Sequence, residues 1–391
     1  MVGPYVWKRL WRRPWICLCS LAMSAVLCVL LSYLSNYREN QQQKLEEARD
    51  AFEVRCIVTD IKGTKSTGLR LREDVLQFVT DETSPLSPYI KDIRITKEFT
   101  YSAPEYGVQT ILDGDYTPLI GITDAHCADQ LDPDQGKICT YFTEDFYRRE
   151  DYVCLVSEGF YQQLESDSIT LSITDPIINP IMQPELGKGT VEFQVVGFYP
   201  GNWQIIYIPF EAAKKLEKEL SGRISCDSIS FLAADNRWLS ALTEAAAERF
   251  GRVDPMFASN DTSALALTVQ DAQYQATVAA LEQNIQRVTL LLPVILLLSL
   301  GAGFFASILS TRNQGRNYAL MRTVGLTRKR LFLSVLSEQL LLPAVAGGIT
   351  AAVSGEGVLI LIYLLCYTAG CIACIIKTVT VPPTAILREQ E

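Results

Sequence analysis

The sequence predicts a polytopic α-helical membrane protein, with four transmembrane helices and a large α+β extracytoplasmic domain inserted between helices 1 and 2. Four stretches are almost entirely apolar, and they cover residues 15–34, 288–309, 331–353 and 358–376. About 20 apolar residues in a helix cross a hydrocarbon layer roughly 30 Å thick. A helix is the form expected there because it pairs its own backbone polar groups. The long stretch 35–287 is mixed in composition and predicts a domain outside the membrane.

The first apolar stretch also resembles a cleavable signal, because basic residues precede it and Arg12-Arg13 forms a twin-arginine pair. However, its apolar run exceeds the roughly 7 to 15 residues of a signal core, and residues 32–35 offer no small-x-small cleavage site. We therefore interpret residues 15–34 as a retained anchor.

Basic residues indicate the orientation of the chain, because they favour the cytoplasmic side of short loops. Residues 1–14 contain four of them, and the connection 310–330 contains six and no acid. The tail 377–391 contains two more. We predict a multi-pass protein of the plasma or inner membrane with both termini in the cytoplasm and residues 35–287 outside.

The ends of the outer domain predict helical stalks at residues 35–52 and 271–287, which lack Gly and Pro and continue the membrane helices. The second stalk has apolar residues at alternating steps of four and three, which is a heptad pattern. The pattern includes Tyr274, Val278, Leu281 and Ile285. Two interpretations stay open: a coiled-coil seam, or an amphipathic helix lying on its own domain.

Between the stalks, strands and helices alternate, which favours an α+β domain in two lobes. Periodicity predicts strands at residues 53–62, 89–96, 152–156, 168–173, 191–198, 204–208, 228–232 and 253–257. It predicts helices at residues 70–79, 211–220 and 236–250. A Pro-Gly-Asn turn between 191–198 and 204–208 predicts that these two strands form a hairpin.

The sequence offers little support for chemistry within this chain. It has no G-x-x-x-x-G-K-[ST] phosphate loop, so we expect ATP and Mg²⁺ to bind a separate subunit and this chain to bind no cofactor of its own. The single histidine, His126, stands in an acidic loop without a recognisable nucleophile motif, and we interpret it as a surface residue.

The cysteines divide between the membrane helices and the outer domain. In the outer domain, Cys127 and Cys139 lack a C-x-x-C companion, so we expect no metal site there. The outer domain has five, so at most two disulfides form, with the pairing open. These five are Cys56, Cys127, Cys139, Cys154 and Cys226.

The connection between the second and third membrane helices is the most informative segment. A short helix is predicted at 317–324, ended by Gly325 as a natural C′ residue. Such a basic helix at the membrane surface is suited to act as a lever on both attached spans. We expect the contacts to a cytoplasmic ATPase to come from Arg316, Asn317, Leu320, Arg322, Gly325 and Arg328. In the next span, Glu338 and Gln339 are polar residues at membrane depth, for which we favour a structural or coupling role.

These residues resemble the FtsX-like/MacB-type ABC permease family. Residues 316–330 read RNYALMRTVGLTRKR, an apolar helix with Glu338 follows, and residues 382–388 read PPTAILR. Asn317 stands where the family usually has Glu, so a charge contact at that position is not carried over. The resemblance covers the architecture of one span, an outer domain and three spans.

The resemblance implies a permease that couples ATP hydrolysis by a separate ABC ATP-binding subunit to movement of the outer domain. Such proteins form homodimers or heterodimers with a similar permease. Relatives export or handle peptides, antibiotics or lipoproteins, or activate cell-wall hydrolases. We expect membrane lipid and no nucleic acid among the partners. The alternatives are a membrane-anchored sensor with an outer ligand-binding domain and, less favoured, a membrane-anchored enzyme.

Overall fold

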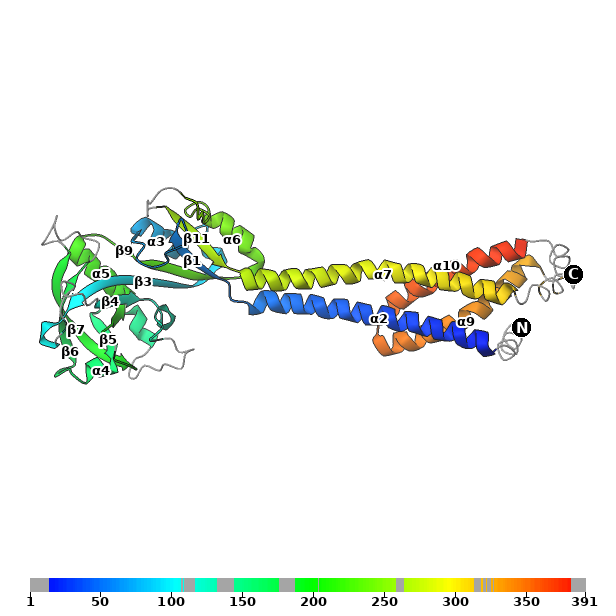
Figure 1. Ribbon diagram of the computed structural model, residues 1–391, viewed down its shortest axis with the longest axis horizontal. Coiled ribbons are helices and arrows are strands. Elements are labelled where there is room, and N and C mark those ends of the chain that lie inside the picture. Colours follow the sequence, from blue (N-terminus) through cyan, green and yellow to red (C-terminus); the bar gives the residue numbers. More distant parts are fainter. Residues whose placement is uncertain are drawn as a thin grey trace. The chain divides into compact units, whose positions relative to one another are not determined.

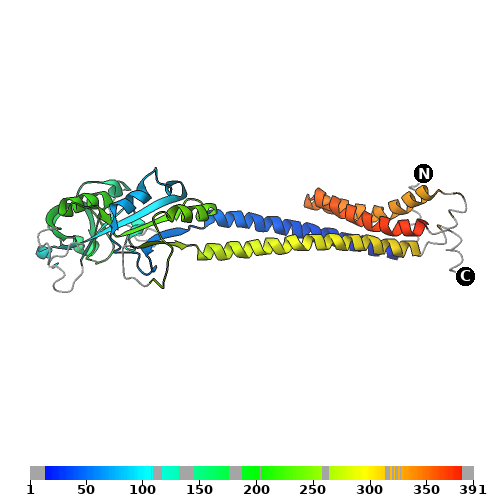
Figure 2. The ribbon, with the colours of Figure 1, turned by 90° about the horizontal axis from the view of Figure 1, so that it is seen from above.

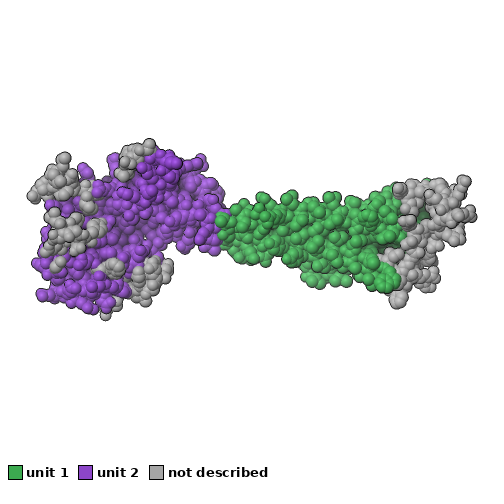
Figure 3. Space-filling view, viewed as in Figure 1, with its two compact units in different colours: residues 1–48, 276–391 green, residues 49–275 purple. Residues whose placement is uncertain are grey.

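The computed structural model describes residues 14–106, 108, 117–131, 144–175, 187–202, 204–257, 264–312, 318, 321, 325 and 327–380. The chain divides into two compact units (Figure 3). We call residues 1–48 and 276–391 the membrane unit and residues 49–275 the sheet unit.

Four long helices make up the described part of the membrane unit: α2 (Pro14–Ala51), α7 (Ala272–Arg312), α9 (Arg328–Ser354) and α10 (Gly357–Thr380). Each is long and apolar enough to cross a membrane, so the chain is a multi-pass membrane protein. The helices α2 and α7 lie side by side in both ribbon views (Figures 1 and 2). Gly355 ends α9 with a φ of 76°, a left-handed conformation that glycine adopts without strain.

The core of the membrane unit contains residues from all four helices, including Cys28, Ile295, Val335 and Tyr367. Helices α7 and α10 approach each other closely, and each presents a glycine to the backbone of the other. A Cβ at Gly303 would collide with the Tyr367 carbonyl, and one at Gly370 would collide with the Leu300 carbonyl. Small residues allow membrane helices to approach in this way.

We expect Gly303→Ala to destabilise the membrane unit by roughly 1–3 kcal/mol, because the added methyl group forces α7 and α10 apart. Thermal unfolding of the full chain in detergent measures the effect. Gly301→Ala is the matched control, because a Cβ at Gly301 meets no atom within 4 Å. Equal unfolding temperatures for the two variants would show that the helices do not cross at Gly303.

The sheet unit is built on one nine-stranded sheet in the order β11-β1-β10-β3-β4-β8-β5-β7-β6. The strands are β1 (Arg55–Asp60), β3 (Ile90–Ser102), β4 (Pro118–Ile122), β5 (Val153–Ser157), β6 (Ser168–Thr174), β7 (Lys188–Tyr199), β8 (Ile206–Pro209), β10 (Ser228–Ala233) and β11 (Leu265–Gln270). A small second sheet pairs β2 (Leu71–Arg72) with β9 (Ser225–Cys226). The helices are α3 (Glu73–Thr80), α4 (Glu158–Tyr161), α5 (Phe210–Ser221) and α6 (Leu239–Ala246).

Strand β3 is long enough to belong to two lobes. Its first half pairs with β10, and its second half pairs with β4 and, through Thr100↔Thr174, with β6. Strand β6 pairs with β7, and the pairing continues through β5 and β8 to β4. Together with β3, these strands form a closed ring of six. The core of the ring is apolar and includes Phe99, Tyr101, Leu171 and Phe193. The expectation of two lobes therefore agrees with the pairing of β3.

A buried ionic network joins the two lobes at β3. The Lys97 ammonium, 1% exposed, donates to Glu217 Oε1 at 2.8 Å and to Ser225 Oγ at 2.7 Å. Asp227 Oδ2 lies 3.9 Å from the same nitrogen and accepts a hydrogen bond from the Glu98 amide at 2.8 Å. Since Glu217 lies on α5 and Ser225 on β9, one cation holds together elements of both lobes.

The structure corrects two sequence expectations in the sheet unit. Strands 191–198 and 204–208 do not form a hairpin, because β5 lies between β7 and β8 and pairs with both. Residues 253–257 contain no strand. The last strand is β11, which pairs with β1 from Arg55↔Gln270 to Asp60↔Leu265. The other predicted strands have counterparts in the sheet.

Candidate functional site

The predicted coupling segment lies partly outside the described residues, which include neither Arg316 and Asn317 nor Leu320 and Arg322. In the described part, Gly325 has a φ of 104°, and Arg328 is the exposed first residue of α9. Tyr318, 4% exposed, and Met321 are three residues apart and pack into the core of the membrane unit. Residues three apart share a helix face. The segment is therefore attached to the bundle through these two side chains.

Glu338 and Gln339 are both buried in α9, each 8% exposed. Neither polar atom of the Gln339 amide completes a hydrogen bond with a residue that the structure describes. The pair of residues thus faces the protein interior rather than lipid, as expected for polar groups at membrane depth.

The heptad positions of α7 form its less exposed face. Tyr274 is 8% exposed, and Val278, Leu281 and Ile285 are half-buried. In residues 34–48 of α2, buried or half-buried positions also occur at steps of four and three: Leu34, Arg38, Gln41, Leu45 and Ala48.

Around Ile285, the two faces meet in a groove that is lined by Gln42, Gln43, Leu45 and Glu46 of α2 and by Glu282, Ile285 and Gln286 of α7. Whether the heptad of α7 forms a coiled-coil seam stays a prediction.

Within the sheet unit, the end of α2 and the start of α7 are tied to neighbouring strands. Strand β1 begins at Arg55, four residues after α2 ends at Ala51, and a single residue, Asp271, separates β11 from α7. Arg55 pairs directly with Gln270 in the β1–β11 ladder. The rings of Phe52 and Tyr274 also pack edge to face, 6.0 Å apart. One helix end cannot slide past the other without breaking this register.

Asn236 fixes the end of α2 further. Its side-chain amide, in a residue only 7% exposed, donates to the carbonyls of Arg49 at 2.8 Å and Phe52 at 2.6 Å. These are carbonyls at a helix C-terminus, which lack intrahelical partners. We did not predict Asn236 from the sequence. In the sequence, Asp235 and Asn236 directly follow a strand. This pattern predicts an ordinary helix N-cap and gives no sign that Asn236 contacts α2.

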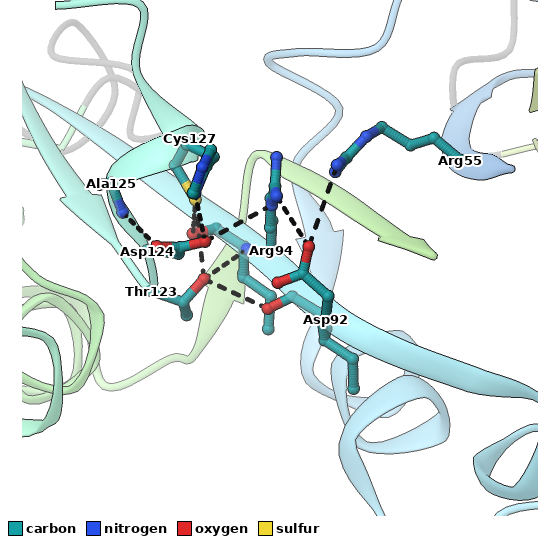
Figure 4. A network of polar contacts seen from close by, with 10 residues as sticks. Arg55, Asp92, Arg94, Thr123, Asp124, Ala125 and Cys127 are labelled. Atoms are coloured by element: carbon teal, nitrogen blue, oxygen red, sulfur yellow. Dashed lines mark hydrogen bonds and ion pairs between the residues drawn. The ribbon is translucent and has the colours of Figure 1, made fainter. Parts of the chain in front are cut away.

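The residues around His126 form a chain of ion pairs at the junction of β1, β3 and the turn after β4 (Figure 4). The Asp92 carboxylate lies 2.7 Å from the Arg94 guanidinium and 3.9 Å from that of Arg55. Asp124 lies 3.6 Å from Arg94 and 2.9 Å from His126 Nδ1. Asp92 has a φ of 50°, and the β3–β10 register shifts between Ser230 and Leu232. A residue with positive φ at a bulge bends the strand.

Cys127 directs its thiol toward Thr123 and the Ile95 carbonyl, whereas the His126 ring is turned toward Asp124. Burial raises the pKa of the Cys127 thiol, which disfavours the nucleophilic thiolate. None of the cysteines that the structure describes forms a disulfide. Cys139 lies outside the described residues.

The four apolar helices and the nine-stranded sheet define a multi-pass membrane protein with a large sheet-rich domain. No family model matches the chain, and no curated protein matches it. Among solved structures, the chain is similar to the periplasmic region of MacB from Actinobacillus actinomycetemcomitans, with a TM-score of 0.33 and 14% sequence identity over 59% of this chain and 94% of that chain. A similarity at this score carries no argument about function.

Proposed function

We propose that this chain is the permease subunit of an ABC transporter complex, and that it transmits movement from the membrane to its sheet unit. The observation that carries the proposal is the construction of α2 and α7. Each is one continuous helix, of 38 and 41 residues, that reaches from a membrane span into the sheet unit. Their ends are tied to the same β1–β11 ladder. A pair of continuous helices is suited to transmit force because it resists bending.

The driving partner in this proposal is an ABC ATP-binding subunit, which binds ATP and Mg²⁺. Its contact surface on this chain comprises Arg316, Asn317, Leu320, Arg322, Gly325 and Arg328. Support comes from the basic sequence of residues 310–330 and from Tyr318 and Met321, which attach the segment to the bundle core. A push on this segment would therefore reach α9 and, through the bundle, α7 and α2. The work done outside would be the export or handling of a peptide, antibiotic or lipoprotein, or the activation of a cell-wall hydrolase.

The ATP-binding partner is tested by purifying the tagged chain from its own cells in mild detergent and identifying the proteins that accompany it. We expect an ABC ATP-binding subunit in stoichiometric amount, together with ATPase activity. We also expect Arg316→Glu and Arg322→Glu to lose that subunit, because like charges would face its docking surface. Arg252→Glu, an exposed position of the sheet unit, is the control. Retention of the subunit by both variants would contradict the coupling role.

The proposed orientation places the sheet unit outside and residues 310–330 in the cytoplasm. We expect a membrane-impermeant thiol reagent to label Glu82→Cys in intact cells and not Thr327→Cys, because only the first side chain would face the reagent. Both positions are exposed, so access within the protein is similar. After the membrane is permeabilised, both should react. Labelling of Thr327→Cys in intact cells would reverse the orientation.

A further inference from the structure

A shallow groove lies along the start of α9. It is lined by two basic and two apolar side chains, Arg328, Lys329, Phe332 and Leu333, and its volume is about 330 Å³. Ligand pockets in proteins typically have volumes of about 300 Å³ or more. Since all four lining residues belong to α9, the groove is a feature of one helix of the membrane unit.

The four side chains are ordered so that the charged pair precedes the apolar pair along the helix. Arg328 lies four residues before Phe332, and Lys329 lies four residues before Leu333. Residues four apart share a helix face, so each basic side chain has an apolar one beside it, one turn further along α9. Arg328 and Lys329 are exposed, Phe332 is half-buried and Leu333 is 62% exposed. The groove is therefore amphipathic, with a cationic end and an apolar end.

The groove lies at one end of a helix that can cross a membrane. This helix, α9, runs from Arg328 to Ser354 and is long and apolar enough to span the hydrocarbon layer. Around the end of a span, lipid headgroups lie beside the first residues and acyl chains lie beside the residues that follow. The cationic end of the groove is therefore at the level of the headgroups, and its apolar end is nearer the hydrocarbon.

The basic residues of the groove have no counterion in the described part of the chain. Arg330 adds a third positive charge next to Arg328 and Lys329, and residues 310–330 contain no acid. Among the residues that the structure describes, no carboxylate forms an ion pair with any of these three side chains. Clusters of Lys and Arg beside a membrane helix attract anionic lipid headgroups. A bound anion would therefore relieve the repulsion among these like charges.

We propose that this groove binds an anionic phospholipid, with the phosphate between Arg328 and Lys329 and an acyl chain along Phe332 and Leu333. The planar guanidinium of Arg328 can donate two hydrogen bonds to phosphate oxygens, and the Lys329 ammonium adds a compact positive charge. The inference goes beyond the proposed function and does not rest on it, since it requires only that α9 begins at a membrane surface. Arg328 also belongs to the proposed ATPase surface, so the test uses the chain without that partner.

The apolar end of the groove distinguishes a lipid from the other anions that basic residues attract. A soluble anion such as inorganic phosphate would contact only the two cations, and Phe332 and Leu333 would contribute nothing to its binding. An acidic protein surface would place charged groups against the exposed Leu333 side chain. A signal for membrane orientation requires basic residues but no groove beside them. An amphipathic anion contacts all four lining residues, and the lipid around α9 supplies one.

The test is native mass spectrometry of the purified full-length chain in detergent, with added phosphatidylglycerol or phosphatidylcholine of identical acyl chains. We expect the first phosphatidylglycerol to bind more tightly than the first phosphatidylcholine, because only phosphatidylglycerol has a net negative charge. The double variant Arg328→Gln/Lys329→Gln should lower the phosphatidylglycerol affinity about 25-fold, since each cation near an anionic lipid contributes about fivefold. Arg287→Gln is the matched control, because it removes an exposed cation beside the apolar part of α7 that does not line the groove. Its affinity should equal that of the wild type.

Leu333→Asn tests the apolar end of the groove and should also weaken the binding of phosphatidylglycerol. Glycerol 1-phosphate, which has the phosphate but no acyl chain, should not compete with the lipid. Thermal unfolding in detergent shows whether each variant is folded, and if the double variant unfolds, Leu333→Asn and the comparison of the two lipids decide the outcome.

Four results would overturn the proposal. The first is equal affinity for the two lipids, and the second is wild-type affinity in the folded double variant or in Leu333→Asn. The third is an equal loss of affinity in Arg287→Gln, which would show a general attraction between lipid and positive charge. The fourth is competition by glycerol 1-phosphate, which would assign the groove to a soluble anion.

Discussion

Replacing Lys97 with methionine is expected to destabilise the sheet unit by about 3–5 kcal/mol, because it leaves buried carboxylates without their cation. Glu217 is 1% exposed, and its Oε1 lies 2.8 Å from the Lys97 ammonium. Asp227, 5% exposed, loses the same cation. Thermal or denaturant unfolding of the full chain, followed by a probe in the sheet unit, measures the loss.

The control is Lys214→Met, which removes a lysine of α5 that pairs with an exposed carboxylate. Lys214 is 2.9 Å from Glu211, but both side chains are substantially exposed. Exposed pairs contribute about 0–1 kcal/mol, so this variant should remain close to wild type. A Lys97→Met variant as stable as Lys214→Met would show that the buried network does not hold the two lobes together.

The destabilisation by Lys97→Met should also depend on pH. Burial raises the pKa of Asp227, and Lys97 acts in the opposite direction by favouring the carboxylate. Without Lys97 the folded-state pKa rises further above the unfolded value, so the folded protein binds the proton more tightly than the unfolded chain does. The deficit should therefore be largest at neutral pH and decrease as the pH falls toward the pKa of an ordinary carboxyl group. A deficit independent of pH would indicate that lost packing, not charge, causes the destabilisation.

The sequence predicted those parts of the fold that depend on local pattern. The apolar stretches identified the four membrane helices. The strand at 191–198 was predicted from its alternation, but its neighbours were not. The turn after it suggested a hairpin, whereas β5, more than thirty residues earlier in the chain, inserts between the two strands. Pairing between distant segments leaves no local pattern to read.

The network around Lys97 was also invisible in the sequence, since its members come from β3, α5, β9 and the residue after β9. In the sequence, each residue of this network looks like an ordinary polar residue of an amphipathic strand or helix. The same holds for Asn236, whose partners at the end of α2 lie more than 180 residues earlier.

The second large effect concerns the α2–α7 seam. Leu281→Pro is expected to remove one backbone hydrogen bond of α7 and to clash with the carbonyl of Thr277, at a local cost of about 3 kcal/mol or more. Leu281 lies within a helix that is continuous from Ala272 to Arg312. If α7 transmits force, the variant complex should still hydrolyse ATP, because the ATPase contacts are remote from residue 281. The variant should instead lose the change that ATP causes in the sheet unit.

That response can be measured as amide hydrogen exchange at residues 49–60, which include the end of α2 and strand β1, with and without ATP. In the wild-type complex we expect ATP to change the exchange of these amides, and in Leu281→Pro we expect no change. Gln283→Ala is the matched control, because Gln283 is exposed on the opposite side of the seam and alanine preserves the helix. If folded Leu281→Pro shows the wild-type response, α7 is not the transmitting element, and a transport pathway among the four membrane helices becomes the better account of this protein.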